Sequence, residues 1–399
     1  MVVERPGLRR FLEAGGRRLL YGRRKTGKTF YARLVLRDYQ YFIVRRGGSI
    51  YDPEADEELD TRAFLRICRL SDRIILDEFH RADPRILDAI HAGSCAENLV
   101  LITSTLHYYR RFVDAPEAPL KGLFLLRRVD LLSPVELLRV DWGVEDPKRL
   151  FELLTLYQEP MLVGRRLEDI VAAGMEYARS LVGEVLDEED HRFTRRFDAI
   201  LEALAAGRTR LTEISSYLYA RGLLEKDSPS LITKYLGVMT LVGLIDRLEV
   251  WGGRGSIYRH HSPLTDLAYY LQARYEFYEV PAPLDYGLRA AEQRLPLLVE
   301  VFVERLLSHL YGLKPVKVLE PEVDVALVRG RRLALVAEVK WVSRSLRRDE
   351  VRRIEAKLHS LGAERSILVV PDAGLVPETS LEVWDAERLI EEARRAPTA

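Results

Sequence analysis

GRRKTGKT, residues 22–29, follows the short apolar run RRLLY and precedes TFYARLVLRDY, whose apolar residues have helical spacing. The stretch fits the pattern G-x-x-x-x-G-K-[ST], which is typical of a phosphate-binding loop between a strand and a helix. Gly22 and Gly27 allow backbone N–H groups to approach phosphate oxygens, and the helix that begins near Lys28 adds its positive N-terminal end. The sequence therefore predicts a nucleotide site here. The alternative is a basic glycine turn.

Each residue type in this loop has an expected role. Lys28 would reach the β- and γ-phosphates, and the hydroxyl of Thr29 would ligate Mg²⁺. The predicted nucleotide-binding residues from this stretch are Gly22, Arg23, Arg24, Lys25, Thr26, Gly27, Lys28, Thr29 and Phe30.

Two further strands end in polar residues. The run DRIILDEF, residues 72–79, places Asp77 and Glu78 at the end of an apolar strand. Asp77 would hold the Mg²⁺ water shell and Glu78 would polarise the attacking water; a solvated strand end is the alternative. ENLVLITSTL, residues 97–106, ends its strand in Thr103, Ser104 and Thr105. A hydroxyl there would contact the γ-phosphate or orient the water.

Composition bounds the class of protein. The chain has 399 residues, a formal net charge of zero and two cysteines, Cys68 and Cys95. The length is enough for two to four domains, and two cysteines supply neither a disulfide framework nor a cysteine zinc site. No apolar run is long enough for a membrane helix, and the N-terminus lacks a secretory pattern. We expect a cytoplasmic protein without a membrane partner, whose contacts with nucleic acid would come from local patches.

The order GRRKTGKT, IILDEF, LVLITSTL resembles the archaeal P-loop ATPases of the AAA+ and STAND group. The resemblance implies ATP or ADP with Mg²⁺, bound by a parallel-sheet core with a helical lid and a winged helix. Many members also carry a C-terminal domain similar to restriction nucleases. By the same resemblance, Ser104 is the polar strand-end residue of the site, and Pro160 in YQEPMLV is the lid residue that contacts nucleotide.

The pattern along the chain suggests five parts: a P-loop ATPase core at 1–143, a helical lid at 144–190, a winged helix at 191–265, a connecting helix and linker at 266–285, and a nuclease-like domain at 286–399. The predicted fold class is α/β and multidomain. The stretch PAPLDYG, residues 281–287, is expected to be a linker.

Three helices, at 193–206, 212–221 and 230–242, precede a hairpin around WGGRG, which is the order of a winged helix. Such a third helix can enter the major groove of DNA. Its polar face has Ser230, Thr233 and Lys234, and the wing has Arg254 and Arg259. The alternative, left open here, is a module that packs between domains, because base readout favours more Arg, Asn or Gln.

The last hundred residues contain a second group of charges. LLVEVFVERLLSHLYG, residues 297–312, is a predicted helix with Glu300 and Glu304 one turn apart. PEVDVALVRGRRLALVAEVKW, residues 321–341, predicts a hairpin around Gly330 in which Arg329 faces Leu333 and Asp324 faces Glu338. Glu338 and Lys340 then share a face. Two acids and a lysine suit metal-dependent phosphodiester hydrolysis.

This region resembles the core of the PD-(D/E)xK nucleases through Asp324 in PEVD and Glu338 and Lys340 in AEVK. The resemblance implies a restriction-endonuclease-like α/β domain with a metal held by Asp324, Glu338 and Glu304, and with Lys340 orienting the water. The alternative is a hairpin whose charges are solvated or form a salt bridge.

Together these patterns predict an ATP-hydrolysing protein whose nucleotide state controls a C-terminal domain that binds DNA or RNA or cleaves it with a metal. The alternative is a STAND-like switch or scaffold whose C-terminal domain binds a partner or DNA without cleavage. A homo-oligomer is compatible with either. The predicted catalytic residues are Lys28, Glu78, Ser104, Asp324, Glu338 and Lys340.

Overall fold

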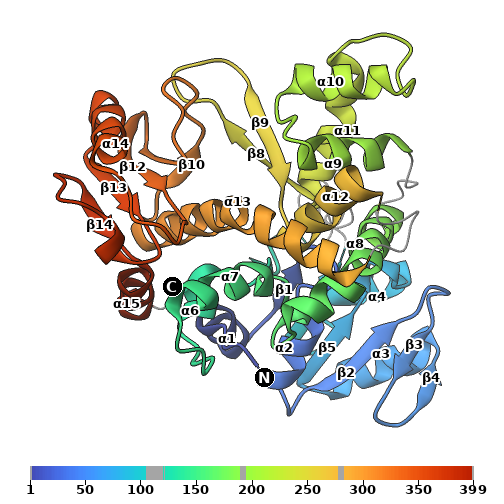
Figure 1. The fold of residues 1–399 in the computed structure, drawn as a ribbon. Helices are drawn as coiled ribbons and strands as arrows, with labels where there is room; N and C mark the ends of the chain where they lie inside the picture. The colour runs from blue at the N-terminus through green and yellow to red at the C-terminus, as the bar shows by residue number, and fades with distance from the viewer. Residues whose placement is uncertain (1, 105–119, 121, 189–194, 277–282, 398–399) are drawn as a thin grey trace.

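The computed structural model describes residues 2–104, 120, 122–188, 195–276 and 283–397, and Figure 1 shows how they are arranged. Their strands form a seven-stranded, a five-stranded and a two-stranded sheet. The predicted α/β class is confirmed, since the largest sheet is mixed but mostly parallel and has helices on both faces. The N-terminal sheet and the C-terminal sheet lie apart, and the long helix α13 extends between them (Figure 1).

The seven-stranded sheet has the order β4-β3-β2-β5-β6-β1-β7. Strands β2, β5, β6, β1 and β7 are parallel, and β3 and β4 extend the sheet as antiparallel strands at one edge. The elements of this core are α1 (Pro6–Glu13), β1 (Arg18–Tyr21), α2 (Lys28–Val35), β2 (Gln40–Val44), β3 (Ile50–Asp52), β4 (Glu57–Leu59), α3 (Thr61–Leu70), β5 (Arg73–Asp77), the 3-10 turn η1 (Phe79–Arg81), α4 (Pro84–His91), β6 (Asn98–Ile102) and β7 (Leu125–Arg128).

Successive apolar residues of the central strands point to opposite faces of this sheet, and both faces are buried. Ile75 and Val100 pack with α1 and α2, whereas Ile74 and Leu101 pack with α3 and α4 on the other side. Because β1, β5 and β6 are parallel neighbours, their C-terminal ends meet at one edge. Ligands of open α/β sheets bind at that edge.

The helices after the core cover the edge at which β1 ends. They are α6 (Pro134–Leu138), α7 (Pro147–Tyr157), the 3-10 turn η3 (Pro160–Leu162) and α8 (Leu167–Glu188). Asp146 caps α7 by accepting a hydrogen bond from the backbone of Lys148, and Pro147 occupies the first turn.

Three short helices and a hairpin follow: α9 (Arg195–Ala205), α10 (Leu211–Ala220), α11 (Ser230–Leu241), β8 (Ile245–Glu249) and β9 (Ser256–His260). Their shared core includes residues of α8 and of the next helix, α12 (Pro263–Tyr275). Tyr269 of α12 is fully buried there, and its hydroxyl donates to Asp198 of α9 at 2.6 Å.

Helix α13 (Leu284–Tyr311) corrects one prediction. The stretch 281–287 was expected to be a linker, but its last four residues are helical from Leu284, with Pro283 at the N-cap. Pro283 occupies the N-cap, directly before the first helical residue, so the proline that indicated a linker instead marks the helix start. Pro296 lies inside this helix.

The C-terminal sheet has the order β10-β11-β12-β13-β14, with the first two pairings antiparallel and the last two parallel. Helices α13 and α15 cover one face and α14 covers the other. The elements are β10 (Lys314–Val316), β11 (Val325–Arg329), β12 (Arg332–Val339), α14 (Arg348–Ser360), β13 (Arg365–Val369), the 3-10 turn η4 (Ala373–Leu375), β14 (Glu382–Trp384) and α15 (Ala386–Arg395).

The hairpin register differs from the prediction at the tip. At its base Val325 pairs with Ala337, which continues to Asp324 opposite Glu338 as expected. At the tip Arg329 pairs with Arg332, and the predicted pairing with Leu333 is wrong because a bulge shifts the register between Leu327 and Val328.

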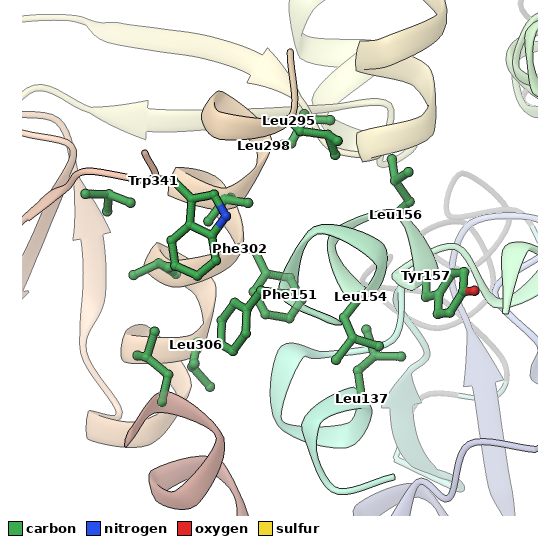
Figure 2. Close-up of a cluster of buried hydrophobic side chains, with 14 of the residues drawn as sticks. Leu137, Phe151, Leu154, Leu156, Tyr157, Leu295, Leu298, Phe302, Leu306 and Trp341 are labelled. Carbon is green, nitrogen blue, oxygen red and sulfur yellow. The ribbon is translucent and has the colours of Figure 1, made fainter. Parts of the chain in front are cut away.

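Helices α6, α7 and α8 share one hydrophobic core with the C-terminal sheet. Phe151 of α7 lies edge-on to Phe302 of α13, with ring centroids 5.5 Å apart, and also contacts Trp341 beyond β12. Figure 2 shows these rings together with leucines of α7 and α13. These contacts pack α7 directly against α13.

A disulfide joins Cys68 of α3 to Cys95 in the loop after α4, across 27 residues of sequence. The two positions were not predicted to pair. Among the helices of the described ranges, none combines the length and apolar character needed to cross a membrane.

Candidate functional site

The glycines of residues 22–29 hold the loop in a shape that other residues would not adopt. Gly22 has φ +144°, and a Cβ there would lie 2.2 Å from the carbonyl oxygen of Val129. Gly27 has φ +83° at the start of α2. The loop therefore wraps around the N-terminus of α2, where backbone N–H groups are available to an anion.

Lys28 and Thr29 point into this loop. The Lys28 ammonium donates to the carbonyl oxygens of Gly22 at 3.0 Å and Arg23 at 2.7 Å. The Thr29 hydroxyl donates to Oδ2 of Asp77 at 2.6 Å. The first turn of α2 is thus joined directly to the end of β5, the arrangement in which a hydroxyl and a carboxylate hold Mg²⁺ beside phosphates.

Asp77 is 5% exposed and accepts a second side-chain hydrogen bond. The Tyr41 hydroxyl of β2 donates to the same Oδ2 at 2.9 Å, while the ring of Tyr41 lies under the guanidinium of Arg33. Burial raises the pKa of Asp77, opposed by the hydrogen bond from Thr29. A divalent cation would favour the ionised form of such a carboxylate. Tyr41 was not singled out from sequence.

Glu78 follows β5 in the left-handed conformation, with φ +54°. Its Oε1 accepts from the Ser104 hydroxyl at 3.2 Å, and its Oε2 lies 3.4 Å from Arg81. His80 contacts both Glu78 and Thr103, and burial lowers the pKa of His80 to about 3, so this imidazole is neutral. The structure therefore brings Glu78 and Ser104 together. Thr105 lies outside the described residues.

Two carboxylates from the helices that follow the core contact the same loop. Both carboxylate oxygens of Glu159 accept from Nη2 of Arg23 at 2.7 Å, and this pair is almost completely buried. Glu184 of α8 pairs with Arg24 at 3.3 Å and with Lys25 at 3.2 Å. Glu159 and Glu184 thus occupy three consecutive cations of the predicted phosphate loop.

An apolar cavity of about 480 Å³ opens beside the loop. Pro160 and Phe30 both line it, so the structure places these two predicted residues next to Gly27. Phe30 is 58% exposed. The cavity is lined by Val2, Val3, Arg5, Lys25, Thr26, Gly27, Phe30, Tyr31, Leu132, Pro160, Met161 and Val163.

Three residues of the second predicted site, Asp324, Glu338 and Lys340, lie at the base of the C-terminal hairpin. The Lys340 ammonium lies 2.6 Å from Oε1 of Glu338 and 4.0 Å from Oδ2 of Asp324. Asp324 also accepts from the backbone N–H of Val339 at 2.8 Å. Lys357 of α14, which was not predicted, donates to Oε2 of Glu338 at 2.5 Å. Both oxygens of Glu338 are therefore held by lysines.

Glu304 does not reach this cluster, which corrects a prediction. Its carboxylate accepts two hydrogen bonds from Arg259 of β9, at 3.1 and 2.5 Å, and is thereby bound to the hairpin. Glu300, one turn earlier, faces the cluster instead. Burial, followed by the charge of Asp324, raises the pKa of Glu300 to about 8.

The carboxylates do not converge as a ready metal site. In the described part of the chain, no group of three or more His, Cys, Asp or Glu side chains is arranged to hold a metal ion. Asp324 and Glu338 are the residues that would hold one, after Glu338 leaves a lysine. Burial, and then the charge of Glu338, raises the pKa of Asp324, as expected when two acids lie close together.

The hairpin β8–β9 is docked against the C-terminal sheet. The backbone N–H of Trp251 donates to Lys317 and that of Lys317 donates to Glu249, both at 2.9 Å. Arg259, one of the two wing cations, is partly buried and pairs with Glu304 and Asp246, which favours the packing alternative for this residue. Arg254 at the tip is exposed. On α11, Ser230, Thr233 and Lys234 are also exposed.

Sequence reasoning missed the residues whose partners are distant in the chain. Glu159 lies 136 positions from Arg23, and Tyr41 lies 36 positions from Asp77. Neither has a local pattern that reveals its role. Glu300 had a signal, since it lies one turn from Glu304 on a predicted helix, but the sequence does not show which of the two lies level with Asp324 along α13.

No model of a known protein family matches this chain, and no curated protein matches it. Among solved structures, a Walker-type ATPase of Pyrococcus abyssi is 18% identical, with a TM-score of 0.49 over 67% of this chain and 96% of its own. The ORC2 protein of Aeropyrum pernix, solved in ADPNP–ADP complexes, is 14% identical, with a TM-score of 0.40 over 74% of this chain and 91% of its own.

A STAND protein with a tetratricopeptide repeat sensor from Pyrococcus horikoshii is 16% identical, with a TM-score of 0.28 over 78% of this chain and 51% of its own. Since every identity here is below 25% and every TM-score below 0.5, a functional proposal must rely on this chain's own residues.

Proposed function

We propose that this chain binds and hydrolyses ATP with Mg²⁺ at the loop of residues 22–29. The observation that carries the proposal is the 2.6 Å hydrogen bond between Thr29 and Asp77, beside Lys28 and with Glu78 next in sequence. A hydroxyl and a carboxylate for the metal, a lysine for the phosphates and a second carboxylate for the water are the parts that phosphoryl transfer needs.

The residues would divide the work as follows. Backbone N–H groups of the loop and Lys28 bind the phosphates, for which Lys28 must exchange the carbonyls of Gly22 and Arg23 for phosphate oxygens. Thr29 and Asp77 hold Mg²⁺, which supplies charge stabilisation on the β- and γ-phosphates when bound. Glu78, oriented by the Ser104 hydroxyl, accepts the proton of the attacking water.

The apolar cavity that Phe30 and Pro160 line supports a site for the base. Its position next to Gly27 and its volume of about 480 Å³ suit a flat heterocycle attached to phosphates in the loop.

The test is phosphate release from Mg²⁺-ATP by the unaltered chain and by Glu78→Gln. The amide keeps an acceptor for Ser104 but cannot take a proton, so turnover should fall roughly 10²-fold or more while ATP remains bound. Glu225→Gln, an exposed change after α10, serves as the matched control. Loss of ATP binding with turnover per bound site preserved would contradict the role of Glu78.

For the C-terminal domain we propose metal-dependent hydrolysis of DNA or RNA at Asp324, Glu338 and Lys340. The same-face placement of these groups around Lys340 supports this. Exposed residues of α11 and the arginines of α14 would contribute the nucleic-acid contacts. The docked hairpin supports a packing role for the wing.

A second candidate is an ATP-driven switch whose C-terminal domain binds nucleic acid or a partner without cutting. One observation favours it. Lys340 and Lys357 lie 2.6 and 2.5 Å from the carboxylate oxygens of Glu338 and neutralise its charge. Asp324 is then the nearest carboxylate that could bind a metal ion. A cleavage assay with Mg²⁺ or Mn²⁺ distinguishes the two.

A further inference from the structure

Two consecutive residues between α7 and η3 bond to different parts of the molecule. Glu159 holds Arg23 of the loop through both carboxylate oxygens, at 2.7 Å. Gln158 accepts a hydrogen bond from Nη1 of Arg305, on α13, also at 2.7 Å. Gln158 is 1% exposed and Glu159 is 0% exposed, so neither bond competes with bulk water.

Arg23 has capacity for a further anion. Its side chain is 2% exposed, and among the described residues its Nε and Nη1 have no hydrogen-bond partner. Buried donors without acceptors are costly, so an anion entering the loop would be drawn to this guanidinium. Phosphates in the loop would therefore compete with Glu159 for Arg23 or pull both residues toward the ligand.

Arg305 of α13 forms the contact with Gln158. Besides Gln158, its guanidinium donates to Asp246 at 3.0 Å and to the carbonyl of His261 at 2.7 Å. Five residues earlier on α13, Glu300 faces Asp324 of the C-terminal cluster. A shift or rotation of α13 at Arg305 would thus change the distance between Glu300 and Asp324.

The packing around Gln158 and Glu159 favours transmission of a shift from the loop to α13. Tyr157, directly before Gln158, and Leu154 lie in the hydrophobic core that includes residues of both α7 and α13. Figure 2 shows Leu154 within this cluster and Tyr157 at its edge, away from Phe302 and Leu306. Close-packed interfaces of this kind shift between discrete arrangements and do not deform gradually.

We propose that Gln158 and Glu159 are positioning residues that couple phosphate occupancy of the loop to the placement of α13, and so regulate the C-terminal cluster. When phosphates bind, Glu159 shifts together with Arg23. The adjacent Gln158 then shifts Arg305 through the hydrogen bond between them. The inference rests on the proposed ATP site and adds the route by which that site acts on the second one.

The test is hydrogen exchange of α13 amides, with and without a non-hydrolysable ATP analogue and Mg²⁺, in full-length variants. In the unaltered chain the analogue should change exchange in residues 296–311. Gln158→Leu removes the acceptor for Arg305 and should reduce that change at least about fivefold, the lower range of coupling between sites. Nucleotide affinity should stay within about threefold, because Glu159 and Arg23 are unaltered.

Gln158→Glu is the matched variant, because it keeps an oxygen that accepts from Arg305, and it should retain the response. Arg305→Lys, which loses the geometry of the guanidinium, should lose the response as Gln158→Leu does. Exchange without nucleotide controls for folding, and Arg305→Lys replaces Gln158→Leu if the latter fails to fold.

Three outcomes would overturn the inference. If the analogue binds but α13 exchange does not respond in the unaltered chain, the two sites are uncoupled and the ATP site still stands. If Gln158→Leu and Arg305→Lys respond like the unaltered chain, another route carries the coupling. If the analogue does not bind the unaltered chain, the proposed ATP site fails and the inference fails with it.

Discussion

At the residue scale, His261 lies at the meeting point of the core, the hairpin and α13. Its Nε2 is 2.7 Å from Asp130, which follows β7, and its Nδ1 is 2.6 Å from Asp246 of β8. Burial opposes a charge on this ring, but the two carboxylates outweigh it and raise the pKa of His261 to about 9. The imidazolium in turn keeps the pKa of Asp130 far below its usual value despite burial.

This arrangement predicts a pH-dependent stability. The folded pKa of about 9 exceeds the ordinary 6.5, so His261 stabilises the fold fully below pH 6.5 and the contribution is lost as pH rises to about 9. That difference corresponds to on the order of 3 kcal/mol. His261→Gln should lower the midpoint of thermal unfolding at about pH 6 and have little effect near pH 10.

Exposed His359 of α14 gives the control, since His359→Gln removes a histidine without carboxylate neighbours on both nitrogens. If the thermal midpoint of His261→Gln is lower than that of the unaltered chain by the same amount at every pH, His261 is uncharged in the folded state.

Residue types that act within one loop were predictable, and their distant partners were not. Gly22, Gly27, Lys28 and Thr29 follow one another in a pattern whose chemistry is local. The partner of Arg23, in contrast, depends on how the lid packs over the sheet, which no local pattern encodes.

At the element scale, strands and helices were predicted by periodicity, whereas errors arose where a single residue changed the geometry. Alternation indicated β11 and β12, but a bulge near Leu327 moved the tip by one position. Helical spacing indicated the C-terminal half of α13, but Pro283 was interpreted as part of a linker when it caps the helix.

The bond between Cys68 and Cys95 stabilises the packing of α3 and α4 on the seven-stranded sheet. It closes 27 residues of chain, for which about 3–4 kcal/mol is expected from restriction of the unfolded state. Reductant should therefore lower the thermal midpoint of the unaltered chain. The double variant Cys68→Ala, Cys95→Ala should have a lower midpoint that no longer depends on reductant; equal midpoints throughout would contradict the contribution of the bond.

The base of the β11–β12 hairpin gives a prediction for the second site. Asp324→Asn keeps an acceptor for the N–H of Val339 but removes a metal-binding charge, so Mg²⁺-dependent cleavage of DNA or RNA should be lost. ATP turnover should stay within about twofold, because Asp324 lies beside the five-stranded sheet and the loop beside the seven-stranded sheet. Glu364→Gln, an exposed change at the other end of the sheet, is the control.

If the unaltered chain binds nucleic acid and cleaves none with either Mg²⁺ or Mn²⁺, the hydrolytic role of Asp324 is wrong and the non-cleaving switch is the better account.

At the scale of the whole molecule, two polar sites lie on separate sheets, and buried structure fills the distance between them. One hydrophobic core includes the lid helices, α12, α13 and the C-terminal sheet, and a network around Asp246 and Arg305 joins the hairpin to α13. The five parts proposed from sequence are therefore closely packed, and only their order along the chain was apparent from composition and spacing.

Nucleotide binding at residues 22–29 is the claim on which the rest depends, and calorimetric titration of Mg²⁺-ATP into the unaltered chain, Lys28→Ala and the exposed-lysine control Lys226→Ala tests it most directly. The account predicts that the unaltered chain and Lys226→Ala bind one ATP with equal affinity. Lys28→Ala should bind roughly 10- to 100-fold more weakly, because the phosphates lose a charged hydrogen bond. Equal affinity of Lys28→Ala and the unaltered chain, or no binding by any of the three, would contradict the account.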